Sequence, residues 1–130
     1  MSGTGNISTL FVRDLIASEN DPSTPVRHIV QAVGTSSAER RHVFVESALF
    51  EEAQRPTAYA NHHDLVSDTQ VDIVYIGLPN HLHKGACLAA IASHKHVLCE
   101  KPLAINVREV DEIISAARQN RVFLMEGKLI

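Results

Sequence analysis

The sequence predicts an α/β fold with a doubly wound parallel sheet, formed as one partial domain over residues 1–130. Three observations lead to this class. Helical and strand-like segments alternate along the chain, which implies parallel strands joined by right-handed crossovers. Residues 71–77, VDIVYIG, form a nearly continuous apolar run, as in a strand covered on both faces. Residues 3–8, GTGNIS, form a glycine turn that leads directly into an amphipathic segment.

Composition sets limits on the function. The chain has 130 residues, 45% of them hydrophobic, and can bury a single core. Lys and Arg number 12 against 15 Asp and Glu, a net charge of −3, so no basic face is expected for nucleic acid. Cys87 and Cys99 form no C-x-x-C pair, and no secretory or membrane-spanning run occurs. We expect no nucleic acid, no membrane and a reduced, cytoplasmic setting.

The glycine turn normally follows a buried strand, but only Met1 and Ser2 precede it. We therefore expect the first strand to be missing. In the strand order 3-2-1-4-5-6 that strand lies between the second and the fourth. Its loss would divide the sheet and expose two unpaired edges, through which copies of the chain could associate.

The elements of the first half follow in order. A first helix up to about Ser18 is predicted from an apolar stripe at helical spacing: Ile7, Leu10, Phe11 and Leu15. Loop residues end this helix, and residues 28–34, HIVQAVG, form a β-branched run typical of a strand. Ser36 and Glu39 form a capping box that predicts a helix through about Glu52. A short strand near residues 57–60 and a small helix at residues 62–66 come next.

The second half begins with the strand at residues 71–77, which stops at a turn over residues 78–80. An alanine-rich helix is predicted over residues 83–93. Residues 96–100, HVLCE, predict another buried strand, which Lys101 and Pro102 close.

The last helix and strand carry clear signals of their own. Asn106 and Glu109 form a second capping box. The helix that it opens is predicted to bury the stripe of Val107, Val110, Ile113, Ile114 and Ala117. Residues 122–126, VFLME, form the last predicted strand.

Three segments follow the carboxyl ends of predicted strands and should share one edge of the sheet: residues 3–8, 78–83 and 100–102. Gly3 and Gly5 allow a tight turn and a close approach to phosphate oxygens. The helix begun by Asn6 and Ile7 offers unpaired amides and the positive end of its dipole. Ser8 stands where a third glycine is usual. The pattern predicts a site for a dinucleotide.

Residues 77–104, GLPNHLHKGACLAAIASHKHVLCEKPLA, carry a more specific signal. The segment resembles the core signature of the glucose-fructose oxidoreductase/inositol dehydrogenase (Gfo/Idh/MocA) family, and is most similar to its dihydrodiol dehydrogenase and NADP-dependent D-xylose dehydrogenase branch. The matching residues are Pro79, Asn80, His83, His96, Val97, Glu100, Lys101, Pro102 and Leu103. The resemblance implies a Rossmann-like nucleotide-binding domain of an oxidoreductase that acts on sugars or diols.

The resemblance also implies roles for individual residues. Lys101 would lie beside the nicotinamide and the substrate hydroxyl, where its charge stabilises developing alkoxide or assists proton transfer. Glu100 would contact a cofactor ribose or hold the lysine, while Pro79, Asn80 and His83 would lie near the cofactor. The alternative is that Glu100 and Lys101 belong to an ordinary polar loop leaving a buried strand.

The end of the second strand predicts the type of cofactor. No acidic residue stands at Thr35 or Ser36 to bind the hydroxyls of an NAD ribose. Ser36 and Ser37 can instead bind a 2′-phosphate, and Arg40 and Arg41 can supply charge. NADP is therefore favoured over NAD. The alternative is that both arginines form an exposed helix face.

The remaining histidines and cysteines predict no metal site. His81-x-His83 and His94-x-His96 lack a third or fourth ligand at suitable spacing. We expect His83 to cap the helix after Pro79-Asn80, His96 to be structural, and His62 and His63 to be solvated. Cys99 is expected to be a small buried hydrophobe.

The resemblance places this chain as the nucleotide-binding part of an NADP-dependent oxidoreductase, with D-xylose or a trans-dihydrodiol as possible substrate. The substrate domain of the resembled enzymes is not expected within the 130 residues, so a sugar or diol would bind only if that domain is supplied. The alternative is an inactive remnant that at most binds nucleotide. In either case we expect no turnover from this chain by itself, because hydride transfer requires both reactants to be held in place.

Overall fold

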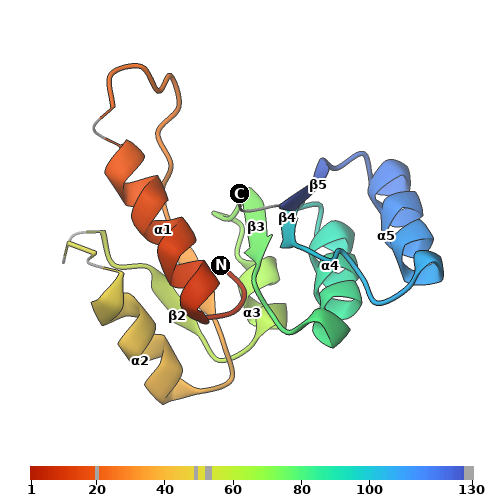
Figure 1. Ribbon diagram of the computed structural model, residues 1–130, viewed down its shortest axis with the longest axis horizontal. Helices are drawn as coiled ribbons and strands as arrows, with labels where there is room; N and C mark the ends of the chain where they lie inside the picture. The colour runs from red at the N-terminus through yellow and green to blue at the C-terminus, as the bar shows by residue number, and fades with distance from the viewer. Residues whose placement is uncertain (20, 49, 52–53, 128–130) are drawn as a thin grey trace.

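The computed structural model describes residues 1–19, 21–48, 50–51 and 54–127, across which helices and strands alternate (Figure 1). The strands are β1 (Ala32–Gly34), β2 (Thr57–Tyr59), β3 (Ile73–Ile76), β4 (His96–Glu100) and β5 (Leu124–Gly127). The helices are α1 (Asn6–Ser18), α2 (Ala38–Ser47), α3 (His62–Ser67), α4 (His83–Ala92) and α5 (Val107–Asn120), with a short 3-10 helix, η2 (Asn80–Leu82).

All strand pairs are parallel, which confirms the predicted class of sheet. β1 pairs with β2, while β4 lies between β3 and β5. The register is continuous across the larger group, where Val74 lies opposite Val97 and Val97 opposite Leu124. Parallel strands require crossover connections, and the helices of this chain supply them.

Residues 1–3, which we call the N-terminal stub, connect the two groups of strands. Ser2 forms single parallel bridges to Gly34 of β1 and Ile76 of β3. The Ser2 amide donates to the Tyr75 carbonyl at 2.8 Å, and the Gly77 amide donates to the Ser2 carbonyl at 2.8 Å. We expected the facing edges of β1 and β3 to be unpaired. This expectation is wrong where Ser2 bridges Gly34 and Ile76. Even so short a segment satisfies backbone groups on both neighbours, and these would otherwise be costly to bury.

The helices cover opposite faces of the sheet, as a doubly wound fold requires. Figure 1 shows α1 and α2 on one side of the strands and α4 and α5 on the other. Successive strand residues point to opposite faces. Val33 and Tyr75 pack with residues of α1 and α2, such as Val12 and Phe44. The larger cluster, on the other face, joins β3 and β4 to α3, α4 and α5.

Two elements of the first half are shorter than predicted. β1 begins at Ala32 rather than at residue 28, and its partner β2 spans only Thr57–Tyr59. Residues 28–30 therefore have no neighbouring strand with which to pair. α2 ends at Ser47 rather than near Glu52, which lies outside the described residues. Its cap is Ser37, whose hydroxyl accepts from the Arg40 amide at 3.2 Å, rather than Ser36.

The predicted buried stripes also need correction. On α1 the buried residues are Ser8 and Val12, whereas Leu10 is 54% exposed. On α5 Ile113 and Ala117 are buried as predicted, but Val107 is 75% exposed at the first turn. Helical spacing identifies a face, and the position of the sheet decides which of its residues are covered.

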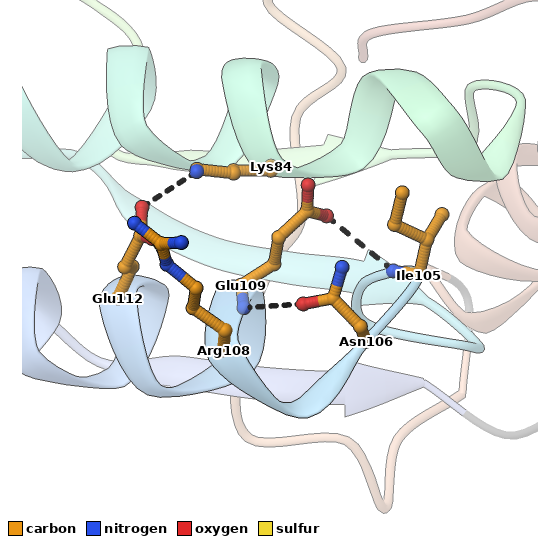
Figure 2. Close-up of polar contacts among 6 residues, drawn as sticks. All are labelled: Lys84, Ile105, Asn106, Arg108, Glu109 and Glu112. Atoms are coloured by element: carbon orange, nitrogen blue, oxygen red, sulfur yellow. Dashed lines mark hydrogen bonds and ion pairs between the residues drawn. The ribbon is translucent and has the colours of Figure 1, made fainter.

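α5 packs beside α4 in the larger apolar cluster, and polar contacts surround its amino end (Figure 2). Asn106 accepts from the Glu109 amide at 2.9 Å, as the capping box predicts. Glu109 reaches back to the Ile105 amide at 3.5 Å rather than to the Asn106 amide. Lys84 on α4 forms an ion pair with Glu112 on α5 at 2.5 Å. These contacts fix the end of the loop that leaves β4.

Candidate cofactor site

The glycine turn lies directly against the end of β3. Gly3 has φ +98°, and a Cβ at this position would lie 2.5 Å from the Gly77 carbonyl oxygen. The Gly3 amide also donates to the Gly34 carbonyl at the end of β1, at 3.2 Å. The left-handed backbone and the close contact both require glycine. The predicted glycine turn therefore lies between the two groups of strands. We call this junction, formed by residues 1–3 with Gly34 and Gly77, the seam.

The amino end of α1 is open to a ligand. Gly5 is the N-cap, with extended backbone and no side-chain capping hydrogen bond. A Cβ on Gly5 would meet nothing within 4 Å. Gly5 and Asn6 are exposed, and Ile7 is partly buried. The first amides of the helix are thus free to bind an anion, as pyrophosphate binding requires.

Ser8 replaces the usual third glycine, and Gly77 provides the space for it. Ser8 is fully buried, and its Oγ atom has no hydrogen-bond partner among the described residues. A Cβ on Gly77 would lie 2.4 Å from this oxygen. α1 can still pack closely against the end of β3. The glycine that this contact requires is Gly77, directly after the strand, rather than a residue of the helix. The sequence argument did not identify Gly77 for this role.

Glu100 accepts a hydrogen bond from a residue for which the sequence predicted no functional role. The Tyr75 hydroxyl donates to Glu100 Oε1 at 2.7 Å, and both side chains are buried. Burial raises the pKa of Tyr75, and the bond to the Glu100 carboxylate raises it further. The Tyr75 ring also stacks on Phe11 of α1, with centroids 4.2 Å apart. Glu100 is therefore an anchored side chain at the end of β4 and not part of an ordinary polar loop.

The side chain of His83 bridges the loop after β3 and the loop after β4. It is fully buried, with Nδ1 2.8 Å from the Pro102 carbonyl oxygen and Nε2 2.7 Å from the Leu78 carbonyl oxygen. The expectation that His83 caps the helix is wrong, because Leu82 is the N-cap and makes no side-chain capping bond. With both ring nitrogens engaged, His83 positions the two loops rather than facing the edge itself.

Lys101, Pro79 and Asn80 are exposed at the same edge of the sheet. Pro79 precedes η2, and its carbonyl accepts from the Leu82 amide at 2.9 Å. Lys101 follows Glu100 directly at the end of β4 and forms no ion pair with any described residue. Its ammonium group is therefore available to a ligand at this edge.

The residues after β1 that are expected to bind a 2′-phosphate differ in their exposure. Ser36 and Arg40 are exposed. Arg41 donates through Nη1 to the Thr35 carbonyl oxygen and is partly buried, so it serves the backbone of this segment. Of the two arginines, Arg40 has the free guanidinium.

His62 is not solvated, contrary to the sequence prediction. Its Nε2 lies 2.9 Å from the Ala86 carbonyl oxygen, and its Nδ1 lies 2.8 Å from Ser2 Oγ. The carbonyl can only accept, so Nε2 carries the proton and Nδ1 accepts from the hydroxyl. Burial lowers the pKa of His62. The ring thus ties the N-terminal stub to α4, while His63 is exposed as expected.

Among the described residues, the two cysteines and His96 have structural surroundings. Cys87 and Cys99 are free and buried, and the contact with Cys87 together with burial raises the pKa of Cys99. Cys99 is therefore the buried apolar residue that was predicted. The His96 Nδ1 accepts from the Phe123 amide at 2.9 Å, a structural contact. Within the described residues there is no cluster of three or more metal-binding side chains, and no helix is long and apolar enough to cross a membrane.

A cavity of about 540 Å³ lies away from this edge. Ile16, Glu19, Val26 and Arg27 are among the residues that line it. These residues flank the carboxyl end of α1, about 20 Å along the helix from the glycine turn. The predicted site is instead an open edge, formed by the turn and by the loops after β1, β3 and β4.

Comparisons with known proteins agree with this geometry. Residues 1–128 match the family GFO_IDH_MocA, "Oxidoreductase family, NAD-binding Rossmann fold". A trans-1,2-dihydrobenzene-1,2-diol dehydrogenase from Xenopus laevis is 37% identical over 124 residues, which are 95% of this chain and 34% of that protein. The chain thus spans about a third of the length of this relative.

Solved structures show the same fold. An NAD-binding oxidoreductase from Klebsiella pneumoniae superposes with a TM-score of 0.86 at 32% identity, covering 97% of this chain and 32% of that one. A 3-ketoreductase from Actinomadura kijaniata, in complex with NADP and TDP-benzene, gives a TM-score of 0.76 at 28% identity, covering 97% and 35%.

Proposed function

The chain belongs to the Gfo/Idh/MocA oxidoreductase family, and from this membership we propose that it is the NADP-binding part of an enzyme that oxidises the CH–OH group of a sugar or diol. The observation that carries the proposal is the shared edge of the sheet. There the glycine turn, the exposed Lys101 and the anchored Glu100 come together at the carboxyl ends of parallel strands. Ligands of open α/β sheets bind at this edge.

The residues at this edge fit a dinucleotide. The uncapped amino end of α1 and the close approach at Gly3 suit a pyrophosphate, which needs backbone amides without side chains in the way. These features support cofactor binding by Gly3, Gly5, Asn6 and Ile7.

Lys101 is the proposed catalytic residue. The nicotinamide, when bound, accepts or gives the hydride. An ammonium group beside the substrate hydroxyl stabilises the negative charge that develops on oxygen and assists the movement of its proton. Glu100, fixed by Tyr75, contributes a carboxylate next to Lys101. Pro79 and Asn80, which are exposed after β3, are the proposed cofactor contacts from the neighbouring loop.

NADP is the proposed cofactor, in preference to NAD. Ser36 and Arg40 are exposed after β1, and this segment offers no carboxylate at Thr35 or Ser36. A guanidinium and a hydroxyl bind phosphate through charge-assisted hydrogen bonds. The relatives include dihydrodiol dehydrogenases, which supports a diol as substrate, and D-xylose is the second choice.

A catalytically inactive protein that binds the nucleotide is the second candidate. It is favoured by one observation: no described residue forms an ion pair with Lys101, so no partner orients the proposed catalytic group. With a substrate domain supplied, turnover of NADP with D-xylose or a trans-dihydrodiol, abolished by Lys101→Ala, would exclude it. Nucleotide binding without turnover under that condition would support it.

Calorimetric titration of the chain with NADPH and NADH tests the binding proposal. We expect tighter binding of NADPH, and a loss of about tenfold in NADPH affinity for Arg40→Ala, with no change for NADH. Arg118→Ala, which removes a basic side chain from the exposed surface of α5, is the matched control. Equal affinity for both nucleotides would contradict the cofactor preference, and absence of binding would contradict the function.

A further inference from the structure

We propose that Tyr75 is a positioning residue that holds the Glu100 carboxylate for the ribose on the nicotinamide side of the bound dinucleotide. This assignment rests on the proposed function. Tyr75 itself does not contact the cofactor, since it is only 5% exposed. It acts through the side chain to which its hydroxyl donates.

Glu100 is a buried carboxylate with one hydrogen-bond donor among the described residues. A buried carboxylate needs hydrogen-bond donors, and Tyr75 supplies one to Oε1 at 2.7 Å. The other oxygen, Oε2, has no hydrogen bond with the described residues. Glu100 retains 9% of its surface, at the carboxyl end of β4. One oxygen is therefore fixed, and the other is left to accept from a ligand hydroxyl.

Tyr75 is fixed by contacts of its ring and its backbone. Its ring stacks on Phe11 with an interplanar angle of 9°, and its carbonyl accepts from the Ser2 amide at 2.8 Å. Burial raises the pKa of Tyr75, so its hydroxyl keeps its proton and donates to Glu100. Through this residue α1 and the N-terminal stub, which form the proposed phosphate site, determine where the Glu100 carboxylate lies.

The order of the strands determines the direction in which the proposed dinucleotide extends along the edge of the sheet. The neighbours in the sheet are β1, the N-terminal stub, β3 and β4, in that order. With the pyrophosphate at the glycine turn and the 2′-phosphate at Ser36 and Arg40 beyond β1, the other half extends over β3 and β4. The first carboxylate that it meets there is Glu100. Paired ribose hydroxyls donate to a carboxylate, which identifies the chemical group that Glu100 binds.

The test measures binding of two ligands to the full chain. NADPH contains both riboses, whereas 2′,5′-ADP contains only the adenosine half. For Tyr75→Phe, which keeps the stack on Phe11, we expect NADPH affinity to fall about tenfold, because a hydrogen bond to a charged group is lost. Affinity for 2′,5′-ADP should change less than twofold. Tyr59→Phe is the matched control, since its hydroxyl donates to Asp68 at 3.1 Å, away from the edge.

A double-mutant cycle separates positioning from a structural effect. In a Glu100→Ala background, Tyr75→Phe should change NADPH affinity less than twofold, because nothing remains to be positioned. The same loss in both backgrounds, or equal weakening of both ligands, would overturn the assignment and leave the proposed function intact. If Tyr75→Phe fails to fold, Glu100→Gln must show the same selective loss of NADPH. If the unmodified chain binds neither ligand, the proposed function fails and this assignment with it.

Discussion

The two halves of the sheet differ in how they are held together. The half with β3, β4 and β5 has longer strands and a capped, ion-paired α5. The half with β1 and β2 has strands of only three residues. The half with β1 and β2 is joined to the half with β3, β4 and β5 through the N-terminal stub and His62. The seam that joins the halves is also the proposed phosphate site, so stability and binding depend on the same few residues.

Gly3→Ala is the largest expected disruption of the seam. The change places a Cβ 2.5 Å from the Gly77 carbonyl oxygen and forces a side chain into a left-handed backbone. We expect the free energy of unfolding to fall by about 3 kcal/mol, from backbone strain and overpacking together. Denaturant unfolding measures the loss, and hydrogen exchange should show β1 opening before β4.

Gly5→Ala is the control for this prediction, because a Cβ at Gly5 meets nothing within 4 Å. Its unfolding free energy should stay within about 0.5 kcal/mol of the unmodified chain, as for ordinary surface changes. If Gly3→Ala is equally mild, the seam does not control the coupling between the halves.

His62→Ala has the next largest expected effect. It removes the contacts of the ring with Ser2 and Ala86 and leaves a buried hydroxyl without a partner. The expected loss of stability is about 2 kcal/mol. The matched control is His63→Ala on the exposed side of α3, which should cost almost nothing. Amide exchange in β1 and β2 should accelerate more than in β4, and a uniform acceleration would argue against two unequal halves.

The dependence of stability on pH is the smallest expected effect. Burial lowers the pKa of His62 in the folded chain below its usual value of 6.5. The unfolded chain therefore binds more protons as the pH falls below about 6.5, and stability decreases in that direction. Thermal unfolding between pH 7.5 and 5 should show this loss, with a shallower dependence in His62→Gln. An identical dependence in both proteins would assign the effect to other groups.

Sequence reasoning was most accurate where local signals agree with burial. β4 was predicted to the residue, because the apolar residues Val97, Leu98 and Cys99 lie between polar boundaries. Asn106 was predicted as the cap of α5, since a capping box is a local pattern. The cap of α2 was displaced by one residue because Ser36 and Ser37 are chemically equivalent. β1 was predicted too long, because strand length also depends on the partner strand.

The sequence by itself determined the class of fold, the family signature and the edge at which the glycine turn, Glu100 and Lys101 lie. These features depend on local periodicity and on the rule that parallel strands end at one edge. Tertiary structure alone decided the roles of Tyr75, Gly77 and His62, each of which contacts a residue distant in the chain. It also decided that the N-terminal stub joins the two halves. Backbone groups pair with whichever strand lies beside them, and local sequence does not specify that neighbour.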